Sequence, residues 1–235
     1  MVTEVQNQQV AQRALYKNFP SRVVILTSDK DELKFESIFA IKDPKAAKPA
    51  FEMSKFFTKF VSDDLTLDMS AAVEAIKKSE NYAIIETLDT TKEQRDNSVS
   101  AMVEQLQNLF KNVLDIALSA GDVDKIRASI EDAFVNLAPQ EGDAWIFWKK
   151  QEAHKTVYQY NILFAVQNAE TGLFLYGLPI SMEISADLDK EQVLFITLKD
   201  KVSYRVHVQS IKVITFIEDA LAERAFRKLL ASAAY

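Results

Sequence analysis

The sequence contains no cysteine among its 235 residues, so neither disulfide bonds nor thiolate metal sites can form. Only four glycines occur, and no two of them lie close enough to build the glycine-rich loop that cradles a phosphate. The two histidines, His154 and His207, lack the spacing of a metal-binding pair. No apolar run approaches the roughly 18 consecutive residues of a membrane-spanning helix. Common classes of metal site and nucleotide site are thereby excluded.

The charge and the absence of catalytic motifs exclude further classes of protein. A formal net charge of −6 argues against nucleic acid, whose phosphates require a basic surface, and against binding driven mainly by anionic lipid. No motif of a serine hydrolase, a zinc protease or a calcium loop occurs. We therefore expect no enzyme, no cofactor, and no catalytic, cofactor-binding or metal-binding residues. The first residues lack a basic region followed by an apolar run, so no secretory signal is predicted.

Helical periodicity dominates the first half of the chain. Residues 1–21 are polar and predict a mobile N-terminal arm, whereas the short apolar runs at 22–27 and 82–88 predict strands. The last segment, 217–232, begins with acidic and ends with basic residues, which is typical of a helix. Apolar residues spaced by three and four predict helices near 32–41, 49–61, 68–76, 99–117 and 123–137.

The stretch from Asp143 to Val213 reads as one strand after another. Between Val202 and Gln209, apolar and polar side chains alternate strictly, which is the period of a strand. Turn signals separate strands near 143–152, 156–168, 173–185, 190–199 and 202–213. Because these strands follow one another without helices, this part of the sheet should be antiparallel. We expect a single-domain α/β protein of the α+β type, with helices on both faces of the sheet.

An aromatic patch, Ala144-Trp-Ile-Phe-Trp148, opens this block of strands. Core packing explains Trp145 and Trp148, because aromatic residues dominate protein cores. A membrane-interface belt explains them too, because tryptophan and tyrosine concentrate at that interface. Both interpretations stay open on the sequence alone.

Several segments between about 144 and 213 match the sequence of a known protein family in the same order and spacing. They are Ala144–Trp148, Tyr160-Asn161, Leu163-Phe-Ala165, Gln167-Asn-Ala169, Thr171-Gly172, Lys190-Glu-Gln-Val-Leu-Phe195 with Thr197, Ser203-Tyr204 and Gln209-Ser-Ile-Lys212. Together they strongly resemble the Cyt family of cytolytic delta-endotoxins. Over 22–140 the resemblance is weaker but keeps the same order of elements. A run of identities this long is far more specific than a short motif.

The resemblance implies a mainly antiparallel central sheet flanked on both sides by helical hairpins, in a Cyt-like toxin domain over 22–213 followed by a C-terminal helix or tail at 214–235. It also implies an insecticidal toxin that permeabilises membranes by pore formation or detergent-like action. Such a toxin binds membrane phospholipids directly, typically zwitterionic ones, and self-associates on the membrane. Its soluble form would be a monomer or weak dimer. The alternative is a non-lytic lipid- or glycan-binding virulence module of the same fold.

The family's biology adds expectations about processing and location. Family members are made in a bacterial cytoplasm, are released, and act at target-cell membranes. They are activated by proteolysis near both ends of the chain. Basic residues in the terminal segments are the candidate activation-cleavage sites: Arg13, Lys17, Arg224, Arg227 and Lys228.

Strand alternation then predicts which side chains could meet lipid. A charged residue at the lipid-facing midplane of a spanning strand costs about 2–4 kcal/mol, so Arg205 must face away from lipid. The candidate lipid-facing residues are Tyr158, Tyr160, Ile162, Phe164, Val166, Leu194, Ile196, Leu198, Tyr204, Val206 and Val208. Trp145 and Trp148 are the candidate interface aromatics. On this hypothesis, replacing Phe164 or Val206 by aspartate abolishes vesicle leakage, whereas replacing Gln167 by aspartate has a smaller effect on it.

Overall fold

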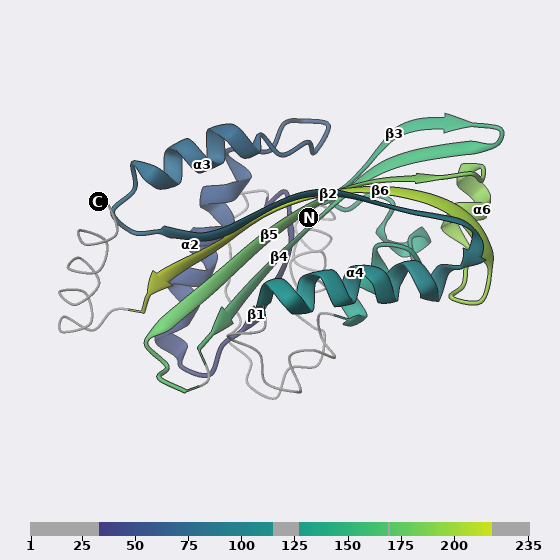
Figure 1. Ribbon diagram of the computed structural model, residues 1–235. Helices are drawn as coiled ribbons and strands as arrows, with labels where there is room; N and C mark the ends of the chain where they lie inside the picture. Colours follow the sequence, from purple (N-terminus) through teal and green to yellow (C-terminus); the bar gives the residue numbers. More distant parts are fainter. Residues whose placement is uncertain (1–32, 115–126, 169, 218–235) are drawn as a thin grey trace, which may run out of the picture.

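The protein's computed structural model describes residues 33–114, 127–168 and 170–217 (Figure 1). The fold is α+β, with one mixed sheet of six strands. The strands are β1 (Glu36–Ala40), β2 (Ala83–Ser98), β3 (Ile146–Glu152), β4 (Lys155–Gln167), β5 (Phe174–Ala186) and β6 (Lys201–Phe216). The helices are α2 (Ala47–Thr58), α3 (Met69–Lys77), α4 (Val99–Leu114) and α6 (Lys190–Leu194), with 3-10 turns η1 (Pro44–Ala46) and η2 (Ala138–Gln140) and a helical stretch at 127–132.

The sheet is mainly antiparallel, as the sequence predicts. Its strand order is β1-β4-β5-β6-β2, and β3 pairs with β4 as well. The pairs β4–β5, β5–β6, β6–β2 and β3–β4 are antiparallel, whereas β1 runs parallel to β4. The central strands are long: β4 and β5 have 13 residues each and β6 has 16. Strands in globular proteins usually have about 5–6 residues.

Helices cover both faces of this sheet, which gives three layers (Figure 1). Helices α2 and α3 lie on one face and helix α4 on the other. The α2-side core includes Met53 and Phe57 of α2, packed with Leu175 and Val213 of the sheet. The α4-side core includes Met102, Leu106 and Phe110 of α4, packed with every second residue of β4, β5 and β6. Side chains therefore alternate between two separate apolar cores along each central strand.

The predicted helix over 32–41 is wrong, because residues 36–40 form strand β1. Glu36 and Ile38 point to the α4-side face, where the Tyr160 hydroxyl lies 2.8 Å from the Glu36 carboxylate. Phe35 and Ile41 point to the α2-side core instead. A short segment that buries both faces shows apolar residues at helical as well as strand spacings, so periodicity alone cannot separate the two. Parallel hydrogen-bonded pairing with β4 makes this segment a strand.

Most other predicted elements agree with the structure to within a few residues. Helices α2, α3 and α4 lie where helical periodicity places them, and Asp68 begins α3 by accepting a hydrogen bond from the Ala71 N–H. Strand β2 is longer than predicted and continues to Ser98. The predicted arm at 1–21, the strand at 22–27 and the helix at 217–232 lie outside the described residues, apart from Ile217.

Candidate functional site

Eight of the predicted lipid-facing residues share one face of the sheet and one core. They are Tyr158, Tyr160, Ile162, Phe164, Val166, Tyr204, Val206 and Val208, each at most 3% exposed. The strand register aligns them across β5: Tyr158 lies beside Ile184, which lies beside Val206. Similarly, Tyr160, Met182 and Val208 form a cross-strand row. The structure thus brings these side chains together into one continuous apolar surface.

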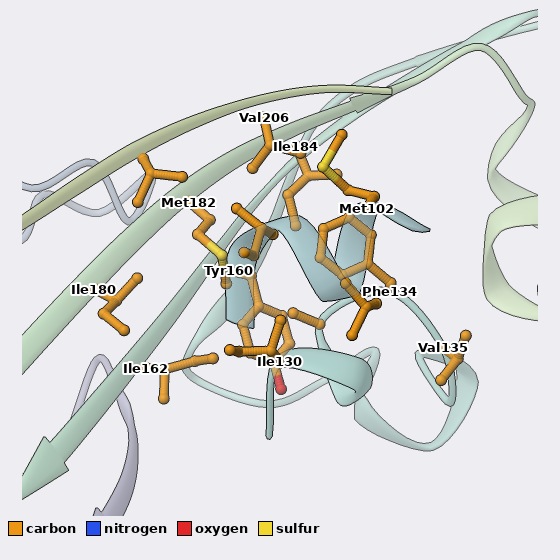
Figure 2. Close-up of a cluster of buried hydrophobic side chains, with 14 of the residues drawn as sticks. Met102, Ile130, Phe134, Val135, Tyr160, Ile162, Ile180, Met182, Ile184 and Val206 are labelled. Atoms are coloured by element: carbon orange, nitrogen blue, oxygen red, sulfur yellow. The ribbon is translucent and has the colours of Figure 1, made fainter. Parts of the chain in front are cut away.

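One helical layer covers this surface in the structure. Met102 of α4 and the side chains of Ile130 and Phe134 point at the strands (Figure 2). The ring of Phe134 contacts that of Tyr204 edge-on, with centroids 5.2 Å apart. The Tyr158 hydroxyl donates a hydrogen bond to the Ala133 carbonyl oxygen at 2.8 Å. The apolar strand face is therefore shielded by α4 together with residues 130–137.

The opposite face of the same strands is the one against which α2 and α3 pack. These helices leave one end of that face uncovered, and its side chains there are polar. We call this the polar patch; it comprises Asp89, Glu93, Glu183, Arg205, His207 and Gln209. Arg205 pairs with Glu93 at 3.4 Å, and Glu183 pairs with Lys149 at 2.9 Å. The side chain of Arg205 is 70% exposed and that of His207 is 42% exposed. As the alternation predicts, these two residues point away from the apolar face.

Asp89 links the edge strand β2 to β6 within the polar patch. Its carboxylate lies 2.8 Å from His207 Nε2 and accepts a hydrogen bond from Gln209 Nε2 at 3.0 Å. The hydrogen bonds from His207 and Gln209 lower the pKa of Asp89 below its ordinary value. A depressed folded-state pKa means that the carboxylate stabilises the fold above the ordinary aspartate pKa, and that this contribution is lost as the pH falls through the folded value.

Replacing Asp89 by asparagine should therefore make stability less sensitive to acid. We expect the variant to be less stable than the parent at neutral pH by about 1 kcal/mol or less, because exposed ion pairs are screened by solvent. The difference should narrow as the pH falls below about 4. Urea unfolding from pH 7 to pH 3 measures it, with Glu86→Gln on the same strand as the control. Parallel stability curves for parent and Asp89→Asn would contradict the assignment.

Three predicted lipid-facing residues do not lie on a strand. Leu194 ends helix α6, and Ile196 and Leu198 lie in the loop that follows. The predicted strand over 190–199 is thus wrong. The Asp189 side chain binds the Gln192 N–H, and the Gln192 side chain binds back to the Asp189 N–H, which forms a capping box. That pair was the sequence signal for a helix start, and the apolar run behind it obscured the signal.

The two candidate interface tryptophans both pack against the α4-side core. Trp145 is 9% exposed, and its indole N–H donates to Gln140 Oε1 at 3.4 Å. The centroid of the Trp148 ring lies 5.2 Å from that of the Tyr158 ring and 4.7 Å from Lys190 Nζ. Core packing therefore accounts for both residues in this state of the protein. A role at a membrane interface stays a prediction for a rearranged state.

The close approach of α2 to the sheet depends on Gly177 in the middle of β5. A Cβ atom at this position would overlap Met53 Sδ and lie 2.9 Å from Met53 Cε and 3.0 Å from Val213 Cγ2. Met53 is itself fully buried. Glycine inside a strand often marks a close approach, so the sequence indicates that something packs tightly here but not which residue does so.

The substitutions suggested by strand alternation would test folding as well as lipid contact. Phe164 and Val206 are buried in the α4-side core, where an unpaired carboxylate is costly before any membrane is met. Gln167 is no neutral control, because its side-chain oxygen accepts hydrogen bonds from the Lys42 and Asp43 N–H groups. Its amide nitrogen donates to the Gly172 carbonyl. Sharper tests need positions whose change leaves the fold intact.

Neither a metal centre nor a spanning helix occurs in the described ranges. Across 33–114, 127–168 and 170–217, no three histidine or acidic side chains are placed to hold a metal ion. In the same ranges, no helix has the length and apolar character needed to cross a membrane. The candidate cleavage sites Arg13, Lys17, Arg224, Arg227 and Lys228 lie outside the described residues.

Comparison with known proteins identifies the class to which this sheet and its helical layers belong. A family model described as Bacillus thuringiensis toxin matches residues 15–230. The type-2Aa cytolytic delta-endotoxin of Bacillus thuringiensis subsp. kyushuensis is 31% identical over 206 residues, which cover 86% of this chain and 79% of that protein. The type-1Aa cytolytic delta-endotoxin of subsp. morrisoni is 43% identical over 130 residues. That match spans 55% of this chain and about half, 52%, of the relative's length.

Solved structures show the same architecture. A delta-endotoxin structure superimposes with a TM-score of 0.78 at 31% identity, covering 86% of this chain and 90% of that one. The activated Cyt2Ba monomer of Bacillus thuringiensis subsp. israelensis superimposes with a TM-score of 0.75 at 30% identity, covering 79% of this chain and 100% of that one. The fold is therefore that of the cytolytic delta-endotoxins. The chain belongs to the Bacillus thuringiensis toxin family, and within it to the Cyt-type toxins.

Proposed function

We propose that this protein is a cytolysin that binds lipid directly and permeabilises the target-cell membrane with the α4-side face of strands β4, β5 and β6. One observation carries the proposal: over residues 158–166, 176–186 and 202–208, three adjacent strands turn a row of apolar side chains to the same face. Among the described residues, a layer made of α4 and residues 130–137 covers this face, and beyond Val208 strand β6 adds the buried Ser210 and Lys212 to it. When that layer moves away, acyl chains can replace the helix contacts, so the apolar side chains stay out of water.

Strand length supports a spanning arrangement. A strand that crosses a bilayer needs about 9–11 residues. Strands β4, β5 and β6 have 13, 13 and 16 residues, so each exceeds that length. The cytolytic delta-endotoxins named above share this sheet, which makes direct membrane attack by strands the simplest use of the fold.

The distribution of charge supports the same conclusion. Over the last eleven residues of β5, from Tyr176 to Ala186, the α4-side positions are all apolar. The alternate positions are glycine, proline, serine, glutamate and serine. The facing part of β6 has Ser203, Arg205 and His207 on the polar side. A strand with one apolar row and one small or polar row can face lipid on one side and a lumen on the other.

The proposal includes processing and partners. The membrane partners are zwitterionic phospholipids, in line with the net charge of −6. Trimming at Arg13 or Lys17 and at Arg224, Arg227 or Lys228 would activate the toxin, which then self-associates on the membrane. The relative's structure is named an activated monomer, which supports an activation step in this family. The protein would be made in a bacterial cytoplasm, released, and active at the membranes of target cells.

Dye release from phosphatidylcholine vesicles tests the function. We expect purified protein to release an encapsulated dye, and limited trypsin treatment to increase the rate several-fold. A rate that trypsin leaves unchanged would contradict the activation step. A non-lytic lipid-binding module of the same fold is the second candidate. It would sediment with the vesicles without releasing dye, before and after trypsin treatment, and that result would overturn the proposed lysis.

A further inference from the structure

Phe195 projects from the connection between β5 and β6. It is 76% exposed, whereas the other exposed large apolar residues of the described ranges are 39–42% exposed. It follows helix α6 directly, at the end of the sheet where β5 ends and β6 begins (Figure 1). An aromatic side chain this exposed keeps its apolar surface in water, and contact with a membrane would bury that surface.

The surrounding backbone holds Phe195 outward. Val193 and Ile196, on either side, are buried in the α4-side core, which fixes the direction of the chain between them. The Asp200 carboxylate accepts hydrogen bonds from the Thr197 N–H at 2.7 Å and from its hydroxyl at 2.9 Å. The carbonyl of Leu198 accepts a bond from the Ser100 N–H at the start of α4. Phe195 is therefore presented by a loop with many hydrogen bonds.

The charges of the connection that carries Phe195 are mixed in sign. From Asp187 to Lys201 there are four acidic residues and three lysines, and Lys199 and Lys201 are exposed. With no positive excess, this connection suits a zwitterionic bilayer better than an anionic one. Phenylalanine, like tryptophan and leucine, can bury its apolar surface at the boundary between lipid headgroups and acyl chains, and lysines can extend from there toward lipid phosphates. A second protein copy fits less well, because one phenylalanine provides far less than the roughly 800 Å² that each partner of a stable complex buries.

We propose that Phe195 is the first point of contact with the membrane and inserts into the interfacial region of a phosphatidylcholine bilayer. This inference rests on the proposed function and adds an orientation to it. Docking through Phe195 places the connected ends of β5 and β6 at the bilayer surface. The proposed function assigns the apolar face of these two strands to lipid contact. They would therefore enter the bilayer as a hairpin, with the loop at 187–200 in front.

Replacing Phe195 by serine tests the contact without disturbing the core. We expect binding to phosphatidylcholine vesicles, measured by sedimentation over a range of lipid concentrations, to weaken about tenfold, the loss of one buried aromatic side chain. The thermal midpoint should not change. Phe195→Trp should retain binding. Leu173→Ser, at the opposite end of β5 and 39% exposed in the parent, is the matched control and should bind like the parent.

A fluorophore can report the contact directly, because the chain has no cysteine that would react elsewhere. A nitrobenzoxadiazole label at Phe195→Cys should shift to the blue and be quenched by spin-labelled phosphatidylcholine before dye release begins. The same label at Leu173→Cys should stay aqueous at that stage. If the blue shift instead appears without vesicles and grows with protein concentration, the label contacts a second copy of the protein. That result would overturn the proposal.

The outcomes separate this inference from the proposed function. If the parent releases dye and Phe195→Ser binds and lyses equally well, the docking role of Phe195 is wrong and the cytolytic function stands. If the parent releases no dye but the label at residue 195 enters the bilayer, docking stands and lysis is wrong.

Discussion

Valine in place of Gly177 is expected to lower the free energy of unfolding by about 1–3 kcal/mol, the usual cost of an overpacked core. The new side chain would displace Met53 of α2, which lies against the glycine. Valine is favoured in strands, so the loss cannot come from strand propensity. Because the strain falls on the contact between α2 and β5, it should also favour separation of the helical layer. We expect dye release to become about tenfold faster for each 1.4 kcal/mol.

The controls separate steric strain from a general effect of losing glycine. Gly142→Val is the matched variant, because a Cβ atom at Gly142 would meet no atom within 4 Å. Adding Met53→Ala to Gly177→Val should recover part of the lost stability, since the shorter side chain makes room. Urea unfolding and vesicle leakage are measured on all four proteins. If Gly177→Val is destabilised but lyses at the parent's rate, separation of α2 does not limit lysis.

The central sheet could be predicted because its signal is local. On β6, alternation from Val202 to Gln209 alone separates buried Val206 and Val208 from exposed Arg205. The same period in β4 placed Tyr158, Tyr160 and Ile162 on one face, and the structure puts them in one core. Each of these strands has a face with a distinct chemistry, so its period is visible in the sequence.

The errors have two causes: pairing between segments far apart in the sequence, and a local helix-capping signal that periodicity does not use. Strand β1 packs against a core on each face, with Ile38 buried on one and Phe39 partly buried on the other, and only its pairing with β4 distinguishes it from a helix. At 190–199, the side-chain bonds between Asp189 and Gln192 begin a short helix, which sends Phe195 into solvent. The sequence could not show that Gly177 lies under Met53, because that contact depends on how α2 crosses the sheet.

The two helical layers do not have equal consequences for membrane insertion. Moving α4 uncovers the apolar face, while the polar patch on the other side is already exposed. A sheet lying flat on the membrane therefore needs only the α4 layer to leave. A strand that spans the bilayer needs more: about 10 residues counted back from Ala186 reach Gly177, where α2 is packed. Helix α2 exposes Lys48 and Glu52, which cannot enter the hydrocarbon region cheaply.

A disulfide between residues 53 and 177 should therefore slow lysis strongly. A Cβ atom at residue 177 would lie at about a carbon–sulfur bond length from Met53 Sδ. The Cγ and Sδ atoms of Met53 thus mark approximately where the two sulfur atoms of a Met53→Cys/Gly177→Cys bridge would lie. The parent sequence has no cysteine to form competing bridges. We expect the oxidised protein to bind vesicles but to release dye at least about tenfold more slowly, a barrier increase of about 1.4 kcal/mol or more.

Reduction supplies the control within the same molecule. Dithiothreitol should restore dye release, because it frees α2 without any other change in sequence. The single variants Met53→Cys and Gly177→Cys should lyse with and without the reductant, which shows that neither substitution is itself inhibitory. If the oxidised protein lyses as fast as the reduced one, α2 stays on the sheet during attack. The strands would then lie on the bilayer through their α4-side face, and permeabilisation would follow from crowding of that surface instead of from spanning strands.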